Sequence, residues 1–282
     1  MGYNSYGNIN YCYSLVTVNV TSPARAGGLV GTTAGGTIKN SYAKGAVKGA
    51  NTCGGLTGAN FFTAVTNSYA TGTVTGNNYI GGLIGYSYYA ANASSYATGA
   101  VTGNDYVGGL IGYSDNGSII YSWVSGAVKG RHFIGGLTGY DYKAIITKCR
   151  STGAVTATGF YAGGLIGYAY SAATSNSYAT GKVAGQYYAA GLAGYIYSGS
   201  VTNCYAAGKV AGKANYTGGL IALNSYGKFT SSYWDKQTSG QAKSAGGTGL
   251  TTAAMKTKAS YKSWDFTKTW TIKDKSTYPS LR

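Results

Sequence analysis

The sequence has no glutamate, a single histidine, two prolines and few charges of either sign. Charged side chains make up 10% of its 282 residues, and all six acidic residues are aspartates; a soluble domain ordinarily carries about 25% charged residues. His132 and the dispersed carboxylates do not form the clusters that acid–base catalysis or metal binding needs. We therefore predict that the protein is not an enzyme and holds no metal ion or cofactor.

Long apolar runs are also missing. No segment reaches the roughly 18 apolar residues of a membrane span, so we predict no membrane insertion. The N-terminal string MGYNSYGNIN lacks the basic region and apolar core of a signal peptide. Either the chain stays inside a cell or, as we expect, it is a mature or excised segment.

Glycine and tyrosine, by contrast, are abundant, with 47 and 30 copies, and the net charge is +16. Together with many Thr, Ser and Val, this composition favours strands and turns over helices. A basic surface attracts polyanionic neighbours such as acidic glycans, anionic envelope polymers or nucleic acid.

An internal repeat organises most of the chain. A G-G-L-type string recurs with steps of 27 or 28 residues, and S-Y-A-x-G-x-V follows each copy. The aromatic position of the second string always lies 13 residues after the leucine. Every change in repeat length falls after the valine and before the next leucine, which predicts an exposed turn there. The eight leucines are Leu29, Leu56, Leu83, Leu110, Leu137, Leu165, Leu192 and Leu220.

Alternation within the second string is typical of a strand. In residues 95–102, Ser, Ala, Gly and Val share one parity, while Tyr, Thr, Ala and Thr share the other. The columns headed by Ile38, Ala43 and Val47 are therefore predicted to face inward, with the tyrosines and threonines outward. Cys12, Cys149 and Cys204 fall in a small inward column and are predicted to be buried free thiols. Identical asparagines at 40, 67, 176 and 203 are expected to hydrogen-bond along the coil axis.

A unit of 27 residues is too short for a βαβ crossover. We predict an all-β fold, a β-solenoid (parallel β-helix) of about eight 27–28-residue coils over residues 1–233, with an incomplete first coil. Residues 234–282 lose the period and carry several aromatic and basic residues. We predict that they form a C-terminal cap on the last coil, with a short Thr-capped helix near residues 251–256.

The two repeated strings resemble the GLUG repeat of bacterial cell-surface proteins over about residues 10–233. The strings Tyr233-Trp234-Asp235, Trp264-Asp265-Phe266 and Tyr278-Pro279-Ser280-Leu281-Arg282 look like the closing segment of such arrays. This resemblance implies an adhesin-like protein at the cell surface or outside the cell, or a repeat array beside a protease domain. The chain contains no HExxH string of its own.

One outward column is the candidate binding site, and we call it the ladder. It is expected to stack on sugar rings or on another rod, or simply to stabilise neighbouring coils. A second aromatic set flanks the leucine, with members such as Tyr79 before it and Tyr86 after it. The ladder consists of Tyr42, Tyr69, Tyr96, Trp123, Arg150, Tyr178 and Tyr205.

We hypothesise a non-enzymatic bacterial surface or secreted rod with an adhesive or structural role, contacting acidic glycans or other envelope polymers. The alternatives are a self-assembling fibre subunit that docks end to end with like chains, a spacer beside a catalytic domain, and an ice-binding surface. Lysines at 44, 48 and 129 interrupt the threonine columns that ice binding would use. Scattered lysines also argue against nucleic acid. Asp115 and Asp141 are considered as a weak cation site, and His132 as a solvated corner residue.

Overall fold

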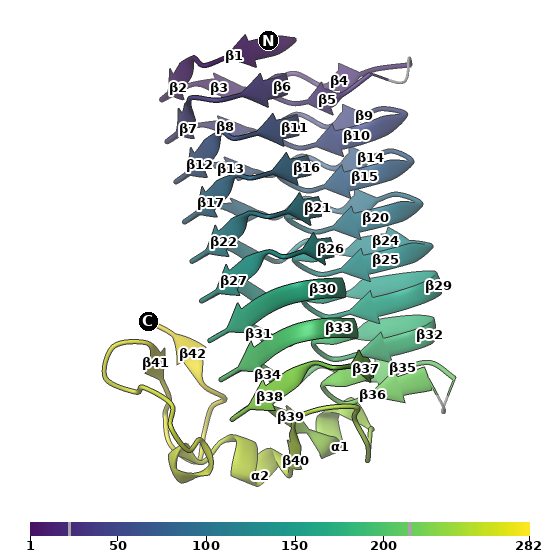
Figure 1. Ribbon diagram of the computed structural model, residues 1–282, viewed down its shortest axis with the longest axis vertical. Coiled ribbons are helices and arrows are strands. Elements are labelled where there is room, and N and C mark those ends of the chain that lie inside the picture. The colour runs from purple at the N-terminus through teal and green to yellow at the C-terminus, as the bar shows by residue number, and fades with distance from the viewer. Residues whose placement is uncertain (22–23, 214–215) are drawn as a thin grey trace.

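A computed structural model describes residues 1–21, 24–213 and 216–282. It confirms the predicted β-solenoid, in which successive coils stack as parallel strands along one axis (Figure 1). The coil over residues 51–75 serves as the example. It consists of β10 (Asn51–Gly54), β11 (Thr57–Phe61), β12 (Ala64–Thr66), β13 (Tyr69–Ala70) and β14 (Val74–Thr75).

Three parallel sheets run the length of the rod. Sheet A contains β11, β12, β1 (Tyr3–Ser5), β2 (Asn8–Asn10), β6 (Val30–Ala34), β7 (Thr37–Lys39), β16 (Ile84–Tyr88), β17 (Ala91–Ala93), β21 (Ile111–Asp115), β22 (Ser118–Ile120), β26 (Thr138–Tyr142), β27 (Ile145–Thr147), β30 (Ile166–Ser175), β33 (Ala193–Thr202), β37 (Ile221–Ser225) and β38 (Lys228–Thr230). Sheet B contains β13, β3 (Tyr13–Ser14), β8 (Tyr42–Ala43), β18 (Tyr96–Ala97), β23 (Trp123–Val124), β28 (Arg150–Ser151), β31 (Tyr178–Ala179), β34 (Tyr205–Ala206), β39 (Tyr233–Asp235) and β40 (Thr248–Leu250). Sheet C contains β10, β14, β4 (Val18–Asn19), β5 (Ala26–Gly27), β9 (Val47–Lys48), β15 (Asn78–Gly81), β19 (Val101–Thr102), β20 (Asp105–Gly108), β24 (Val128–Gly130), β25 (His132–Gly135), β29 (Val155–Gly163), β32 (Val183–Ala190), β35 (Val210–Ala211) and β36 (Thr217–Gly218).

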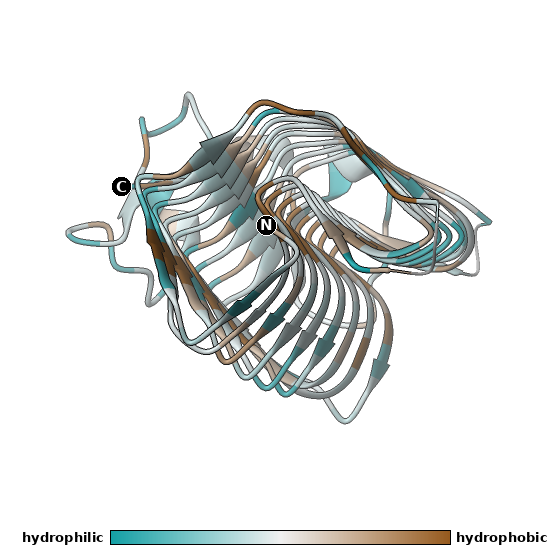
Figure 2. Ribbon diagram, turned by 90° about the horizontal axis from the view of Figure 1, so that it is seen from above, coloured by the Kyte–Doolittle hydropathy of each residue, from teal (hydrophilic) through white to brown (hydrophobic). Residues whose placement is uncertain are grey.

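Each coil encloses two apolar lobes, which are visible when the rod is viewed along its axis (Figure 2). The larger lobe holds the leucine column together with the columns headed by Ile38 and Ala43. The smaller lobe holds the column headed by Val47. The predicted inward columns are therefore confirmed, and seven of the eight leucines are wholly buried, whereas Leu29 is partly buried.

Glycine is required where the two lobes meet. A Cβ added to Gly55 would lie 2.7 Å from the Cβ of Ala70 and 2.1 Å from the carbonyl oxygen of Gly82. Neither neighbour is the end of a flexible side chain, so a larger residue would push the coils apart. The glycine pair thus allows the backbone to approach both the facing strand and the next coil.

Three columns of left-handed residues turn the chain at its corners. Asn40, Asn67, Asn176 and Asn203 belong to one of them, with φ between 46° and 53°. Ser94 and Lys148 occupy the same column with the same conformation. In the described residues no hydrogen bond joins one asparagine of this column to the next, and Asn40 donates instead to Asn10 (3.1 Å). The predicted asparagine ladder is therefore wrong: these residues serve a backbone conformation that asparagine tolerates well.

The predicted insertion corner is confirmed on sheet C. Strand β29 pairs with β32 through a register shift between Ala157 and Phe160, after the valine and before the next leucine. The extra residue of this coil is therefore accommodated as an irregularity, while the other sheets keep their register.

The tail first extends the rod and then turns back along it. Strand β40 pairs in parallel with β39 on sheet B, and the Trp234 side chain joins the core of the larger lobe. The predicted short helix is confirmed as α2 (Thr252–Met255). Its predicted Thr cap is confirmed as well, since the Thr251 side chain accepts a hydrogen bond from the Ala254 N–H. The remaining elements are α1 (Lys236–Ser239), η2 (Lys258–Ser260) and an antiparallel pair, β41 (Trp270–Thr271) and β42 (Ser280–Leu281), which lies beside sheet B (Figure 1).

Candidate binding surface

The ladder lies along sheet B as a continuous stack of rings. Tyr42, Tyr69 and Tyr96 have ring centroids 4.8 Å apart with nearly parallel planes, and Trp123 follows at 4.5 Å. These separations match the strand spacing of about 4.8 Å, so one ring per coil is stacked without strain. Each of the four side chains is half-buried, which leaves an edge of every ring in solvent.

Tyr13 adds a further ring to this stack, at 5.3 Å from Tyr42. Tyr13 is not among the predicted ladder residues, although the aromatic half of the repeat is recognisable around it. Arg150 continues the column, with its guanidinium carbon 5.3 Å from the Trp123 ring. Lys44 lies 5.1 Å from the Tyr42 ring, so cations accompany the stack near both of its ends.

The tail covers the far end of the ladder. Tyr178 and Tyr205 are only 8% and 1% exposed, because Trp264, Trp270 and Tyr278 pack against them. The Tyr205 hydroxyl also donates to the Pro279 carbonyl oxygen at 2.6 Å. The prediction that these two tyrosines face outward as contact residues is therefore corrected, since the outward side of the sheet is occupied by the chain itself.

Arg150 stands at the boundary between the open and the covered part. Burial raises the pKa of the Tyr178 phenol, while the neighbouring Arg150 guanidinium acts in the opposite direction. The open stretch of the ladder therefore runs from Tyr13 to Arg150 and ends on a positive charge.

The second aromatic set forms a separate surface on sheets C and A, which we call the tyrosine face. The column of Tyr79 and the column of Tyr86 lie side by side on either side of the leucine turn, and their rings meet edge to face at 6.1 Å. Burial raises the pKa of Tyr86 to about 12. The two columns are Tyr79, Tyr106, Phe133, Tyr161 and Tyr188, and Tyr86, Tyr113, Tyr140, Tyr168 and Tyr195.

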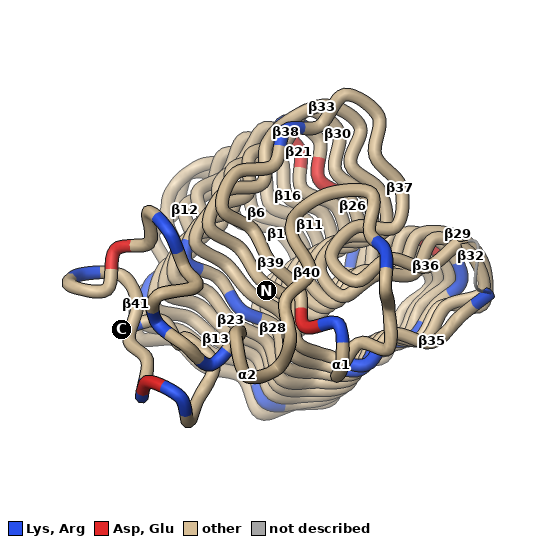
Figure 3. The backbone as a smooth tube through the Cα atoms, turned by 90° about the horizontal axis from the view of Figure 1, so that it is seen from below, with Lys and Arg blue, Asp and Glu red and all other residues tan. Residues whose placement is uncertain are grey.

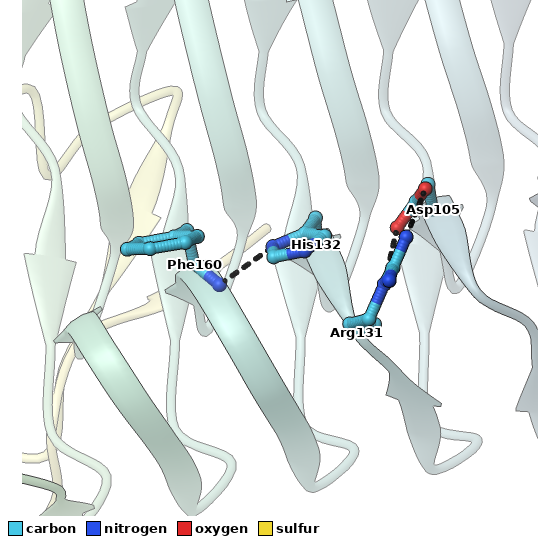
Figure 4. A network of polar contacts seen from close by, with 4 residues as sticks. All are labelled: Asp105, Arg131, His132 and Phe160. Atoms are coloured by element: carbon cyan, nitrogen blue, oxygen red, sulfur yellow. Dashed lines mark hydrogen bonds and ion pairs between the residues drawn. The ribbon is translucent and has the colours of Figure 1, made fainter.

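His132 has a structural role in the insertion corner (Figure 4). Its Nδ1 accepts a hydrogen bond from the Phe160 N–H at 2.9 Å, and its ring stacks on the Phe160 ring at 5.2 Å. Beside it, Arg131 forms an ion pair with Asp105 at 3.2 Å. His132 is therefore half-buried and bonded, rather than the fully solvated residue that we expected.

The considered cation site at Asp115 and Asp141 is wrong. Asp141 pairs in register with Ser114 and points into the core, whereas Asp115 pairs with Tyr142 on the outward side. In residues 1–21, 24–213 and 216–282, no group of three or more His, Cys, Asp or Glu side chains is placed to hold a metal ion.

The prediction of buried thiols is confirmed for two of the three cysteines. Cys149 and Cys204 are buried and unpaired, and burial raises the pKa of each to about 12. Cys12 is exposed, which corrects the prediction for the first coil. It lies between β2 and β3 of the first coil, where no earlier coil covers it in the described residues.

Positive charge is distributed around the rod rather than along one groove (Figure 3). Residues 1–227 contain only three acidic residues, Asp105, Asp115 and Asp141, and none of them lies on sheet B. The ladder is therefore free of carboxylates over its open stretch. No helix in the described part of the chain is long and apolar enough to cross a membrane.

Comparison with known families agrees with the repeat. Residues 22–48, 158–184 and 185–211 match the model of the GLUG motif. No curated protein and no solved structure matches the chain. The matched segments fall on the same period as the remaining coils, which share their register and core columns. The chain therefore contains GLUG repeats at three matched positions, within a β-solenoid of about eight coils.

Proposed function

We propose that this chain is a structural rod of the bacterial surface or extracellular space that adheres through the ladder to linear anionic polymers such as acidic glycans. The GLUG repeats and the β-solenoid fold of this chain fit a repeat-type structural protein, and so a rod. The observation that carries the adhesive role is the open stack from Tyr13 to Arg150, with one aromatic ring per coil and a guanidinium at its end.

The chemistry of this surface suits a polysaccharide. The apolar face of a pyranose ring packs on an aromatic ring, as other flat groups do. Arg150 supplies planar donors for carboxylate or sulfate groups, and the absence of acidic residues on this face removes repulsion. Because the ladder presents one aromatic ring per coil, a linear polymer can contact several rings at once, which raises avidity without any new type of contact.

A binding titration with a carboxylated polysaccharide tests the proposal. Trp123 is half-buried, whereas Trp234, Trp264 and Trp270 are all at least 93% buried, so ligand-induced changes in tryptophan emission report mainly on the ladder. Replacing Tyr69, Tyr96 and Trp123 together by Ala is expected to weaken binding at least tenfold, measured by calorimetry. The matched control is Tyr226→Ala, which removes a ring that is 80% exposed and lies outside the ladder. Unchanged binding by the triple variant would contradict the proposal.

End-to-end assembly is a second candidate, favoured by the surface of the first coil. Tyr11, Leu15 and Val16 are 77%, 60% and 68% exposed there, an unusual amount of apolar surface for a single coil. Sedimentation velocity over a hundredfold range of concentration tests this candidate. A concentration-independent monomer would exclude it, and Val16→Asp should suppress any self-association that is seen.

A further inference from the structure

Counted from the N-terminus, coil 1 contains β1–β4, coil 2 contains β5–β9 and coil 3 contains β10–β14. Coil 2 interrupts the aromatic columns of sheet A with small residues. Strand β6 lies between β1 and β11 near the N-terminal end of the rod (Figure 1). Thr32 pairs with Tyr3 on one side, and Ala34 pairs with Phe61 on the other. Further along sheet A, the column of Thr32 continues as Ala59 and then, from Tyr86 on, as tyrosines, so coils 2 and 3 lack a ring that later coils carry.

The missing rings leave a slot between two aromatic walls. Tyr3 and Tyr6 of coil 1 form one wall, and Phe61 and Phe62 of coil 3 form the other, with Thr32 and Ala34 among the lining residues between them. The cavity has a volume of about 390 Å³ and opens to solvent. Tyr3, Tyr6 and Phe62 are 61%, 82% and 59% exposed, so much of the wall surface has no partner within the chain.

The lining rings of the slot are staggered rather than paired across coil 2. Ala34 lies between Phe61 and Ser5, so no ring of coil 1 stands directly opposite Phe61. A Cβ added to Gly35 would lie 2.5 Å from Cδ1 of Tyr6, so the Tyr6 ring leans over coil 2 and lines the slot from above its backbone. A ligand ring in the slot would therefore pack against aromatic rings that come from both neighbouring coils.

Arg25 supplies a charge at the edge of the slot. Its guanidinium carbon lies 5.0 Å from the Phe61 ring, and the side chain is exposed. The ion pair between Arg131 and Asp105 is the one found in the described residues, so Arg25 has no carboxylate partner there. Arg25 also borders a neighbouring hollow of about 230 Å³, lined by Thr52, Tyr79 and Tyr86.

We propose that this slot binds one carboxylate-bearing pyranose ring, a uronic acid unit, against its aromatic lining. The carboxylate accepts paired hydrogen bonds from the Arg25 guanidinium, which is a planar fork matched to that group. The hydroxyl groups of Tyr3, Tyr6 and Thr32 line the cavity beside the rings and suit a polyhydroxylated ring better than a plain aromatic acid. The slot is on sheet A and does not depend on the sheet B ladder.

Calorimetric and saturation-transfer NMR titrations with a short oligogalacturonate test this site in the variant that lacks the ladder rings Tyr69, Tyr96 and Trp123, to which each slot substitution is added. A neutral hexose oligomer of equal length and benzoate are the comparison ligands. We expect the oligogalacturonate alone to bind. Arg25→Gln should weaken it at least tenfold, because the charge-assisted pair is lost. Ala34→Tyr should block it by supplying the missing ring, whereas Ala34→Ser should bind as the unchanged chain does. Thermal unfolding of each variant shows whether it is folded.

Several results would overturn the proposal. Equal binding of the neutral oligomer or of benzoate would exclude recognition of a uronic acid. Undiminished binding by folded Ala34→Tyr and by Arg25→Gln would place the ligand elsewhere. The triple ladder variant separates this site from the proposed function, because it should keep the Arg25-dependent binding of the oligogalacturonate. Complete loss of that binding in the triple variant would show that the slot does not bind the oligogalacturonate.

Discussion

The hydroxyl of Thr138 donates a hydrogen bond to Oδ2 of Asp141 at 2.6 Å inside the larger lobe. Oδ1 of the same carboxyl group is buried and has no hydrogen-bond partner in the part of the chain that the structure describes. Ser114 and Ala169 occupy the paired positions on the neighbouring coils, so Asp141 is the single acidic member among small residues. Burial raises the pKa of this carboxyl to about 7, against the weaker opposing effect of the Thr138 hydrogen bond.

The raised pKa predicts that stability falls as the pH rises from about 4 to 7. In this window the unfolded chain has lost a proton that folded Asp141 retains, so unfolding releases a proton and is favoured by higher pH. The folded state is most stable below the unfolded pKa of about 4, and the loss is complete once the pH exceeds the folded value. The full effect is about 4 kcal/mol at most, since one pKa unit corresponds to about 1.4 kcal/mol. Urea unfolding between pH 4 and 8 measures it.

Asp141→Asn should remove this pH dependence and make the protein more stable than the unchanged chain at pH 8. Asp105→Asn removes one negative charge at the surface ion pair and is the control for net charge. A slope that survives in Asp141→Asn but disappears in Asp105→Asn would show that the buried carboxyl is not responsible.

Gly72 is predicted to tolerate no side chain. A Cβ at this position would lie 2.0 Å from the carbonyl oxygen of Gly45 on the preceding coil, and the same close approach recurs at Gly99. Because backbone atoms of a stacked coil cannot rotate away, Gly72→Ala should destabilise the rod by about 1–3 kcal/mol, the range of overpacked cores. Gly2→Ala is the matched control, since nothing lies within 4 Å of its added Cβ. Comparable unfolding midpoints for the two variants would contradict the prediction.

The parts of the fold that repeat were predictable, because each inward position is written about eight times. The column of Val74 and Val101 alternates with outward residues in every copy, so the sequence alone excludes a chance pattern. The prediction for the corner column of asparagines was wrong, because a recurring residue type does not imply a recurring side-chain hydrogen bond. Asn40, Lys148 and Ser94 share a backbone conformation and not a chemistry, and side-chain identity alone suggested a hydrogen-bonded row.

The path of the tail was not predictable from periodicity, since residues 234–282 have none. Its aromatic residues indicated packing, but the sequence did not show that they would cover Tyr178 and Tyr205 instead of only the open edge. The slot at coil 2 left a weaker signal, namely Thr32 and Ala34 in columns that are otherwise largely aromatic. Such interruptions are informative in a repeat protein because the neighbouring copies define what is missing.

Trp270 is predicted to hold the returning part of the tail against the ladder. The side chain is wholly buried, its ring lies 4.3 Å from that of Trp264, and its ring centroid is 6.0 Å from that of Tyr178. Replacing a buried tryptophan by alanine costs about 3–5 kcal/mol. Because the tail contacts only the last coils, this loss should open the tail locally before the rod unfolds. Hydrogen exchange should therefore increase over residues 256–282 in Trp270→Ala and remain unchanged over coils 1–4.

The same variant connects the tail to the proposed function. Once the tail detaches, Tyr178 and Tyr205 regain solvent and lengthen the open ladder by two rungs beyond Arg150. If the ladder binds a linear polyanion, Trp270→Ala should bind it more tightly than the unchanged chain, since each added rung contributes a further stacking contact. Tyr226→Ala is the control for loss of an aromatic ring outside this contact. Weaker binding by Trp270→Ala, with hydrogen exchange showing an open tail, would mean that the uncovered rungs do not extend the binding surface.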